Sequence, residues 1–236
     1  EHPGLLGPND YDVAGAATGV VEADAVLGAD RVRPGDAVIA LASSGIHSNG
    51  FSLVRHIVTR AGISYGDQAA DFGTTWGEAL LEPTRLYTTP LLELIAKLRE
   101  TDGGSAVHSL SHVTGGGIAA NLARVLPRGT WVDVDRATWS PSPIFRVLSD
   151  VAGTSLESSE GTWNLGIGFL AVVAGDQADD AVALMQSAGI GAWQVGVVSD
   201  AALPDGEFEQ GAKGVDGGAV RLVGAYSHDN VADGAK

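Results

Sequence analysis

Three glycine-bearing segments constrain this chain more than any other feature of its sequence. They are Ser43–Gly50, Thr114–Gly117 and Asn164–Gly168. The first two stand between an apolar run and a helical pattern, where main-chain N–H groups and the positive end of the helix dipole can hold an anion. The pattern therefore predicts a phosphorylated small-molecule ligand that is bound through main-chain amides.

Composition limits the classes of protein and partner. The chain has 236 residues, of which 44% are hydrophobic and 18% charged, which is typical of one large globular domain or of one domain with part of another. No apolar run is long enough to cross a bilayer. With 14 Lys and Arg against 29 Asp and Glu, the net charge of -15 would repel a polyanion, so we expect neither a nucleic-acid nor a membrane partner.

Cysteine is absent, which excludes disulfides, thiolate metal sites and cysteine nucleophiles. This usage is typical of a cytoplasmic protein, and no stretch resembles a secretory signal, so we expect a cytoplasmic location. The only methionine is Met185, and the chain opens at Glu1. We interpret the chain as a piece of a longer protein.

Apolar spacing predicts a succession of strands and helices. Ala37–Ala42 is a continuous apolar run, typical of a strand covered on both faces, and the pattern from Phe51 has the period of one helix face. Strands are predicted at 11–22, 37–42, 106–110, 131–135, 163–173 and 193–198, helices at 51–61, 90–99, 118–126, 143–149 and 179–188, a loop at 64–76, a mobile tail at 201–218 and an edge strand at 219–223. The predicted fold class is α/β (α+β), a mixed sheet flanked by helices.

The first glycine segment combines hydroxyls, glycines and one titratable group. Its candidate phosphate-binding residues are Ser43, Ser44, Gly45, Ser48, Asn49 and Gly50. His47 could orient a phosphate or transfer a proton near neutral pH. The alternative is a strand-to-helix turn without a ligand, in which Ser48 or Asn49 caps the helix and His47 only forms a local hydrogen bond.

The second segment places three residues without side chains ahead of a helix. Its candidate phosphate-binding residues are Thr114, Gly115, Gly116, Gly117 and, one helical turn later, Asn121. Main-chain amides could approach a phosphate closely here, although the sequence is neither a Walker loop nor a dinucleotide fingerprint. The alternative is a tight turn where the helix packs on a strand.

In the third segment, strand alternation predicts one apolar face and one nearly bare face. Trp163, Leu165, Ile167 and Phe169 would share the apolar face, whereas Asn164, Gly166 and Gly168 would share the other. Two glycines weaken a strand unless a ligand or another backbone must come close, and Asn164 is the side chain that could bind such a ligand. A close helix contact is the alternative.

Several polar residues elsewhere carry weaker signals. Pro83-Thr84-Arg85 predicts a helix start, and Arg85 could hold a phosphate or pair with Glu82 or Glu78 on the surface. His108 and His112 are four residues apart, but the local pattern is that of a strand without a neighbouring acid, so we predict a structural role and no metal site.

Taken together, these segments resemble the aminoimidazole ribonucleotide synthetase family, also called phosphoribosylformylglycinamidine cyclo-ligase. The resemblance rests on Glu1, Pro3-Gly4, Asp10–Gly15, Gly35-Asp36, Ser43–Gly45, His47–Gly50, Ser52–Arg55, Pro83–Arg85, His112, Thr114–Gly117, Asn121, Arg124–Pro127, Asn164, Gly166 and Gly168, which follow the family order as far as about Val198. It implies a ligase of purine biosynthesis that uses ATP and Mg²⁺ to phosphorylate the formyl oxygen of formylglycinamidine ribonucleotide before the ring closes. His47 and Asn164 are the candidate catalytic residues.

The resemblance also implies two domains and a homodimeric parent enzyme. Residues 1–36 would be the end of the N-terminal dimerisation and ATP-binding domain, 37–200 the C-terminal α/β domain and 201–236 an acidic, glycine-rich tail. The acidic, glycine-rich motif through which the family binds most of its nucleotide and magnesium has no counterpart here, so we expect this piece to be inactive alone. Two alternatives are a related kinase or synthetase acting on thiamine phosphate or selenide, and a module that binds phosphorylated ligands without turnover. A serine hydrolase using Ser44 and His47 is a weaker alternative, because no acid and no nucleophile-elbow sequence stands nearby.

Overall fold

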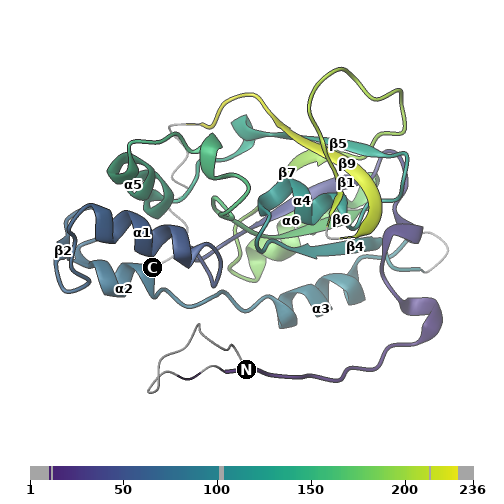
Figure 1. Ribbon diagram of the computed structural model, residues 1–236. Coiled ribbons are helices and arrows are strands. Elements are labelled where there is room, and N and C mark those ends of the chain that lie inside the picture. The colour runs from purple at the N-terminus through teal and green to yellow at the C-terminus, as the bar shows by residue number, and fades with distance from the viewer. Residues whose placement is uncertain (1–10, 12, 101–103, 213, 228–236) are drawn as a thin grey trace.

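The computed structural model describes residues 11, 13–100, 104–212 and 214–227 (Figure 1). The α-helices are α1 Phe51–Arg60, α2 Trp76–Leu80, α3 Thr88–Lys97, α4 Gly117–Ala123, α5 Pro143–Ala152 and α6 Ala178–Ser187. The strands are β1 Ala37–Ala42, β2 Gln68–Ala69, β3 Thr74–Thr75, β4 Val107–His112, β5 Trp131–Asp135, β6 Ile167–Val173, β7 Ala192–Val197, β8 Glu209–Ala212 and β9 Val215–Val223. Short 3₁₀ helices are η1 Ala23–Ala25, η2 Ala29–Arg31, η3 Arg136–Thr138, η4 Glu157–Ser159 and η5 Gly175–Gln177.

The main sheet has the strand order β4-β6-β1-β7, and all three neighbouring pairs are antiparallel. β1 lies inside this sheet, and residues 37–41 are all buried. Val38 and Ala40 point into one apolar core, whereas Ala37, Ile39 and Leu41 point into a second core on the opposite face. The predicted strand that is covered on both faces is therefore confirmed.

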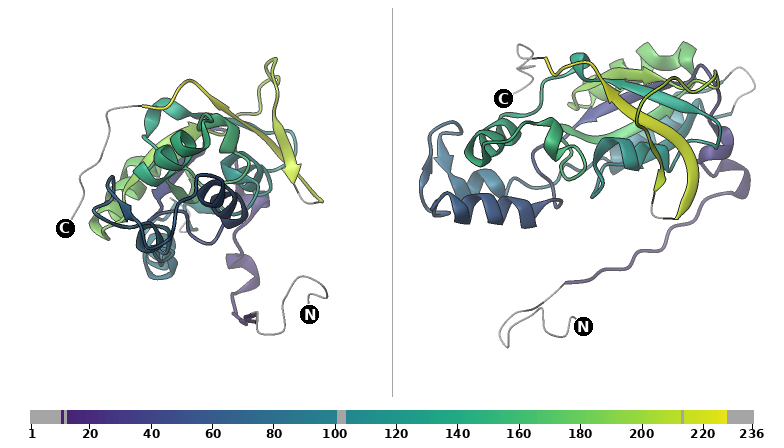
Figure 2. Two further views of the ribbon diagram at one scale, coloured as in Figure 1. Left: turned by 60° about the vertical axis from the view of Figure 1, so that its left-hand side comes forward. Right: turned by 45° about the horizontal axis from the view of Figure 1, so that its top comes forward.

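Helices cover both faces of the main sheet (Figures 1 and 2). One core is closed by apolar residues of α3 and α6, such as Leu94 and Met185, which are about 1% exposed. The opposite core contains Val54 of α1, Leu122 of α4 and Phe145 of α5, all fully buried. The predicted class, an α/β (α+β) fold with sheets flanked by helices, is confirmed, and the mixed pairing that was predicted occurs in the second sheet, since the main sheet is antiparallel.

The C-terminal region forms a second sheet instead of a mobile tail with an edge strand. Its order is β5-β9-β8, with β9 parallel to β5 and antiparallel to β8, so the predicted edge strand is the middle strand. Arg136 and Tyr226 both bind the carboxylate of Glu160, at 2.7 and 2.6 Å, and Arg136 also donates to the carbonyl of Leu222. The low apolar content of the segment led to the wrong prediction, because main-chain pairing and this partly buried ionic network order the segment.

The predicted strand at 11–22 is wrong for the residues that the structure describes. Tyr11 and residues 13–22 have no regular secondary structure and run clear of the domain (Figures 1 and 2). Val20 is 98% exposed. A strand requires a neighbour that offers main-chain donors and acceptors, and no described element lies beside this segment. Glu1, Pro3-Gly4, Asp10 and Asp12 of the resemblance lie outside the described residues.

Three local predictions also need correction. Residues 64–76 hold the short hairpin β2-β3, and α2 begins at Trp76 behind a capping box formed by Thr75 and Glu78. Pro83-Thr84-Arg85 does not start a helix, because α3 begins at Thr88. Residues 163–166 form a turn ahead of β6, since Leu165 and Gly166 have φ angles of 48° and 100°, which interrupt strand geometry.

None of the helices within the described ranges is long and apolar enough to cross a membrane.

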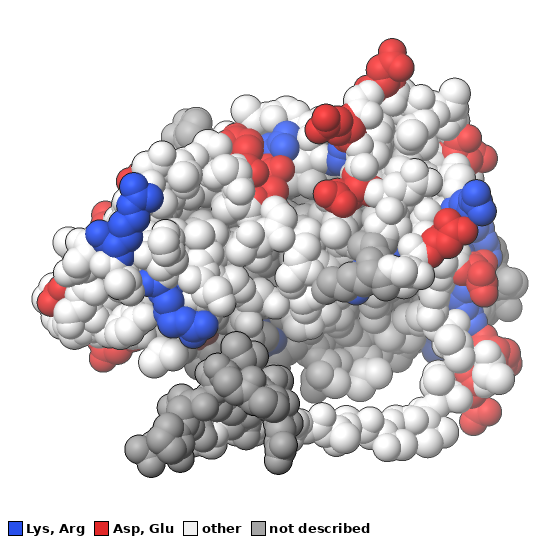
Figure 3. Space-filling model, viewed as in Figure 1, with Lys and Arg blue, Asp and Glu red and all other residues white. Residues whose placement is uncertain are grey.

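The charge of the molecule is uneven over its surface. On the face in Figure 3, basic side chains gather over α1, whereas acidic side chains are spread along the opposite part of the view. Arg55 and Arg60 belong to α1, which carries no Asp or Glu.

Candidate functional site

The loop after β1 is held in shape by Asn164, which is 1% exposed. Its Oδ1 accepts hydrogen bonds from Ser43 Oγ at 3.0 Å and from the Gly166 N–H at 2.9 Å. Its Nδ2 donates to the carbonyls of Gly45 and Ile46 at 2.9 and 3.2 Å. Because all of these groups lie within the protein, Asn164 acts here as a positioning residue, and its predicted catalytic role stays a prediction.

The loop leaves several main-chain donors unused. The N–H groups of Gly45, Ile46, His47 and Ser48 form no hydrogen bond of normal geometry with any part of the chain that the structure describes. The N-cap of α1 is Gly50 in the left-handed conformation without a side-chain cap, so the predicted capping by Ser48 or by its neighbour Asn49 is wrong. A Cβ at Gly50 would lie 2.4 Å from Trp163 Cδ1, which explains the glycine.

His47 combines backbone strain, burial and an unsatisfied ring nitrogen. It has φ of 60° and is 4% exposed. Its Nε2 accepts a hydrogen bond from the Ser44 N–H at 3.2 Å, whereas its buried Nδ1 has no partner. Burial, followed by the nearby His112 and Arg85, lowers the pKa of His47 from 6.5 to about 4. The ring is therefore neutral at pH 7 with its proton on Nδ1, so it can donate a hydrogen bond, and its predicted role in orienting a phosphate or transferring a proton stays a prediction.

Arg85 lies within electrostatic range of His47 and also keeps an unsatisfied donor. Its Nε is buried without a partner, and its Nη1 donates to the carbonyl of Gly189 at 3.3 Å. It forms no ion pair with Glu82 or Glu78 in the part of the chain that the structure describes. The predicted surface pairing is therefore absent, and the prediction of phosphate binding by Arg85 stays open.

Two aromatic side chains complete the surroundings of His47. The ring centroids of His47 and His112 are 6.4 Å apart, and those of His47 and Tyr87 are 6.1 Å apart. The Tyr87 hydroxyl donates to the carbonyl of Ala42 at 2.8 Å, and burial raises the pKa of this phenol. We call His47, Arg85 and His112 the donor cluster.

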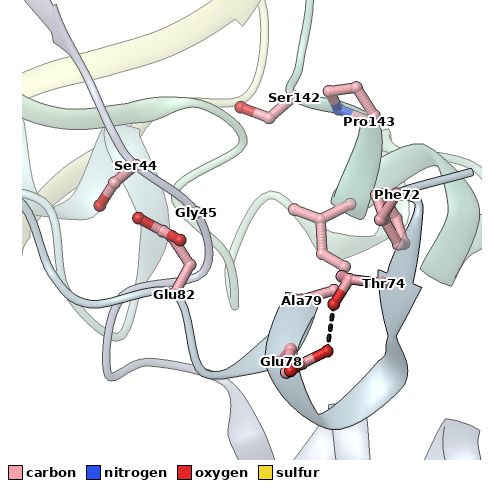
Figure 4. Close-up of a pocket in the computed structure, with 10 residues that line it drawn as sticks. Ser44, Gly45, Phe72, Thr74, Glu78, Ala79, Glu82, Ser142 and Pro143 are labelled. Atoms are coloured by element: carbon pink, nitrogen blue, oxygen red, sulfur yellow. Dashed lines mark hydrogen bonds between the residues drawn. The ribbon is translucent and has the colours of Figure 1, made fainter. Parts of the chain in front are cut away.

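A cavity of about 430 Å³ opens on another side of the same loop (Figure 4). Its lining residues are Ser44, Gly45, Phe72, Thr74, Glu78, Ala79, Glu82, Ser142, Pro143 and Ile144. The lining set includes no Lys or Arg. In Figure 4 the Ser44 hydroxyl and the Glu82 carboxylate lie close together, with Ser142 and Pro143 across the opening.

The second glycine turn is closed by main-chain hydrogen bonds. Gly116 donates its N–H to the carbonyl of Gly161 at 3.1 Å, and Gly117 donates to that of Thr114 at 3.1 Å. A Cβ at Gly117 would lie 1.6 Å from the carbonyl oxygen of Glu160. Close packing therefore explains Gly116 and Gly117, whereas a Cβ at the exposed Gly115 would meet nothing within 4 Å.

Asn121 fixes this turn from the first turns of α4. Its Nδ2 donates to the carbonyls of Thr114 and Gly117 at 3.0 and 2.6 Å, and its Oδ1 accepts from Thr114 Oγ1 at 3.1 Å and from Arg124. Both polar atoms of the amide are thus satisfied inside the protein. The predicted phosphate contacts of Thr114 and Asn121 stay predictions, and close packing of the turn accounts for their present geometry.

The two glycines of the third segment allow close approach of side chains. A Cβ at Gly168 would lie 2.1 Å from the Tyr87 hydroxyl and 2.5 Å from His47 Cε1, so this glycine makes room for the donor cluster. A Cβ at Gly166 would lie 3.4 Å from the main-chain N of Ser142. The predicted arrangement on alternate faces is wrong for Trp163, Asn164 and Leu165, which lie in a turn and are all buried.

The hydrogen bonds of His108 and Ser44 define the roles of these two residues. His108 is 1% exposed, and its ring nitrogens lie 2.6 Å from Asp36 Oδ2 and 3.1 Å from Glu100 Oε1. The hydrogen bond to Asp36 is the main cause that raises the pKa of His108, as expected for a structural imidazolium. Ser44 Oγ donates to the carbonyl of Pro83 at 2.6 Å and not to His47, which argues against a serine hydrolase.

No group of three or more His, Asp or Glu side chains that could hold a metal ion occurs in the described ranges. Sequence reasoning did not select Phe72 and Ser142, which line the cavity. It also did not select Tyr87, whose ring lies beside that of His47. The capping-box spacing of Thr75 and Glu78 was the available signal for α2, which forms one wall of the cavity.

The sheet with helices on both faces and the loop after β1 define an α/β domain with a candidate binding loop. The family model for the C-terminal domain of AIR synthase related proteins matches residues 33–205. A protein of Streptomyces fradiae, provisionally named phosphoribosylformylglycinamidine cyclo-ligase, is 45% identical over 197 residues, which cover 83% of this chain and all of that protein. The chain belongs to the family of these enzymes, which confirms the resemblance.

Two further comparisons define how much of a relative the chain represents. The phosphoribosylformylglycinamidine cyclo-ligase of Sorangium cellulosum is 44% identical over 201 residues, which cover 84% of this chain but 56% of that protein. A crystal structure of thiamine-monophosphate kinase from Stenotrophomonas maltophilia matches with a TM-score of 0.52 and 18% identity, over 85% of this chain and 54% of the kinase. The chain thus spans little more than half of either protein, and the kinase supports the fold alone.

Proposed function

We propose that this chain supplies the C-terminal domain of an enzyme that closes the imidazole ring of aminoimidazole ribonucleotide in purine biosynthesis, from formylglycinamidine ribonucleotide and ATP. Identities of 44% and 45% to named cyclo-ligases support the reaction. The donor cluster is the structural observation that carries the proposal, because two of its buried nitrogens have no acceptor in a protein of net charge -15. An unpaired buried donor costs about 1–3 kcal/mol, which a bound oxyanion would offset.

The reaction defines what the domain has to hold. ATP provides the phosphoryl group that converts the formyl oxygen into a leaving group. A nitrogen of the amidine then bonds to the formyl carbon, the carbon–oxygen bond breaks, phosphate leaves with that oxygen, and the nitrogen loses a proton.

The chain's own contribution is to position the phosphorylated substrate. His47 Nδ1–H and Arg85 Nε–H would donate to the substrate's phosphate, and a neutral imidazole with a depressed pKa remains a donor at pH 7. Asn164 keeps the loop of His47 in the required shape through its four hydrogen bonds. Positioned donors of this kind bind a phosphate without adding net positive charge to the whole surface.

Arg85→Ala tests the donor cluster. Binding of formylglycinamidine ribonucleotide and of its dephosphorylated nucleoside would be measured by titration calorimetry with the 236-residue chain. We expect the substitution to weaken the nucleotide about 10- to 100-fold and to leave the nucleoside unchanged, because a charge-assisted hydrogen bond contributes about 1.5–3 kcal/mol. Arg55→Ala, on the exposed face of α1, is the matched control, and equal losses for both ligands would contradict the proposal.

Turnover provides a second test. The chain would be assayed for ring closure and ADP release alone, and again with the part of the Sorangium cellulosum relative that it does not match. We expect little activity alone and ATP-dependent closure with the added part. Nucleotide binding without turnover in both assays would favour a non-catalytic binding module, and phosphorylation of thiamine phosphate would favour the related kinases.

A further inference from the structure

The cavity beside Ser44 and Gly45 offers hydrogen-bond acceptors, whereas the donor cluster offers hydrogen-bond donors. Ser44 Oγ uses its proton on the carbonyl of Pro83, so the oxygen can only accept a hydrogen bond from a molecule in the cavity. Glu82 contributes a carboxylate that forms no ion pair in the described part of the chain. No Lys or Arg lines the cavity, so it has no positive charge to attract an anion.

Glu82 is held at the mouth of this cavity by the loop itself. A Cβ at Gly45 would lie 3.4 Å from Glu82 Cβ and 3.6 Å from its Cγ, so the carboxylate stem packs directly against the glycine. Figure 4 shows the Glu82 carboxylate beside the Ser44 hydroxyl, both on the same side of the opening. The other acid, Glu78, is occupied by hydrogen bonds in the capping box with Thr75.

The rest of the lining is largely apolar. Phe72, Ala79, Pro143 and Ile144 supply apolar surface, and about 430 Å³ lies within the range of small-molecule pockets. A ligand group that fits acceptors at one end and apolar walls at the other must itself carry hydrogen-bond donors on a compact frame. A positive charge would be favoured further, because Glu82 is unpaired.

We propose that this cavity is the subsite for the amidine group of the substrate and that Glu82 is the residue that selects it. The inference rests on the proposed function for the identity of the substrate. An amidinium is planar, carries N–H donors and a positive charge, and can present two parallel donors to one carboxylate, as a guanidinium does. The corresponding amide has a carbonyl oxygen, which would face the acceptors of Ser44 and Glu82 and be rejected.

The arrangement assigns the two ends of the substrate to the two sides of one loop. Ser44 lines the cavity with its hydroxyl and donates its N–H to His47 of the donor cluster. The phosphate would lie toward Arg85 and His47, and the amidine toward Glu82. Asn164 fixes the loop between them through the carbonyls of Gly45 and Ile46.

Selection between amidine and amide is the direct test. Binding of formylglycinamidine ribonucleotide and of formylglycinamide ribonucleotide, which differ in this one group, would be measured by titration calorimetry for the wild type and for Glu82→Gln. We expect the wild type to prefer the amidine at least about 10-fold, since a charge-assisted hydrogen bond contributes at least about 1.5 kcal/mol, and the variant to lose this preference. Glu82 is exposed and has no partner to lose, so the variant should fold. Glu93→Gln on α3 is the control for removal of a carboxylate.

The possible results separate this inference from the proposed function. Loss of the preference in Glu82→Gln, with amide binding retained, supports the amidine subsite. Equal binding of both ligands by the wild type, or a preference that survives in the variant, overturns the subsite while the proposed function stands. Failure of the wild type to bind either nucleotide overturns both.

Discussion

The two glycine segments that precede helices look alike in sequence but are used differently in the structure. In the loop after β1, the main-chain amides from Gly45 to Ser48 form no hydrogen bond with any described residue, and Gly45 borders a cavity. In the turn before α4, the amides of Gly116 and Gly117 are paired with carbonyls. Glycine thus borders a cavity in the first segment and allows close backbone contact in the second. Sequence composition alone does not distinguish these two uses.

One buried asparagine fixes each segment, and the two asparagines differ in how far along the chain they lie from the segment that they fix. Asn121 lies in the helix that directly follows its turn, so the contact is local. Asn164 is 121 residues from Ser43, so the first loop takes its shape only when distant parts of the fold have assembled. The open loop therefore depends on the whole domain, whereas the closed turn depends on its own helix.

Gly117→Ala should produce the largest loss of stability. A small loss would contradict the view that the second turn is closely packed. A methyl group would overlap the Glu160 carbonyl oxygen, and the φ of 69° is strained for alanine. We expect a loss of about 4 kcal/mol or more in the free energy of unfolding, measured by urea denaturation. Gly115→Ala is the control, with a change within about 0.5 kcal/mol, and equal losses at both positions would refute the packing explanation.

Asn164→Ala sharpens the comparison, with Asn121→Ala as its counterpart. Both remove buried hydrogen bonds, so we expect each to lower the free energy of unfolding by about 2–3 kcal/mol. Only Asn164→Ala should also weaken binding of formylglycinamidine ribonucleotide, by about 10-fold or more, because it releases the loop that carries His47. Similar loss of binding in the Asn121 variant would place a ligand at the second turn instead.

The pH dependence of stability gives the smallest expected effect. The pKa of His47 is lowered from 6.5 to about 4 in the folded protein, so the unfolded chain binds more protons between these values. The contribution of His47 is complete above about pH 6.5 and is lost as the pH falls toward 4.

His47→Asn, which tolerates the left-handed backbone, should therefore remove about 1–2 kcal/mol of the stability difference between pH 7 and pH 4. Unfolding by urea at several pH values would measure it. His56→Asn, on the exposed side of α1, is the control and should leave the wild-type profile intact. An unchanged profile in His47→Asn would mean that the imidazole is not held neutral.

The spacing of apolar residues predicted the strands and helices whose burial depends on their own local sequence. The strands Ala37–Ala42 and Trp131–Asp135 were predicted with their observed bounds, and the helix from Phe51 was one residue too long. The prediction failed where contacts between distant residues determine the backbone conformation. Leu165 takes a positive φ that no propensity anticipates, and β9 is ordered by partners far away in the sequence.

The candidate site was predicted in part for the same reason. The sequence selected His47 in the first glycine segment, Asn164 in the third and Arg85 after Pro83-Thr84, because each side chain could bind a phosphorylated ligand. It did not reveal which of them face a ligand, since that depends on hydrogen bonds to distant carbonyls. The cavity was missed altogether, because its lining comes from three stretches that lie far apart in the sequence, 44–45, 72–82 and 142–144.

The position of β9 in the middle of the second sheet has a consequence for how the protein is made. β5 pairs along its length with a strand that leaves the ribosome much later, with Trp131 beside Ala219 and Asp135 beside Val223. Until β9 is synthesised, β5 has no partner strand in this sheet, because β8 also pairs with β9. Formation of the second sheet therefore waits for a contact between distant parts of the chain, which slows folding relative to local pairing.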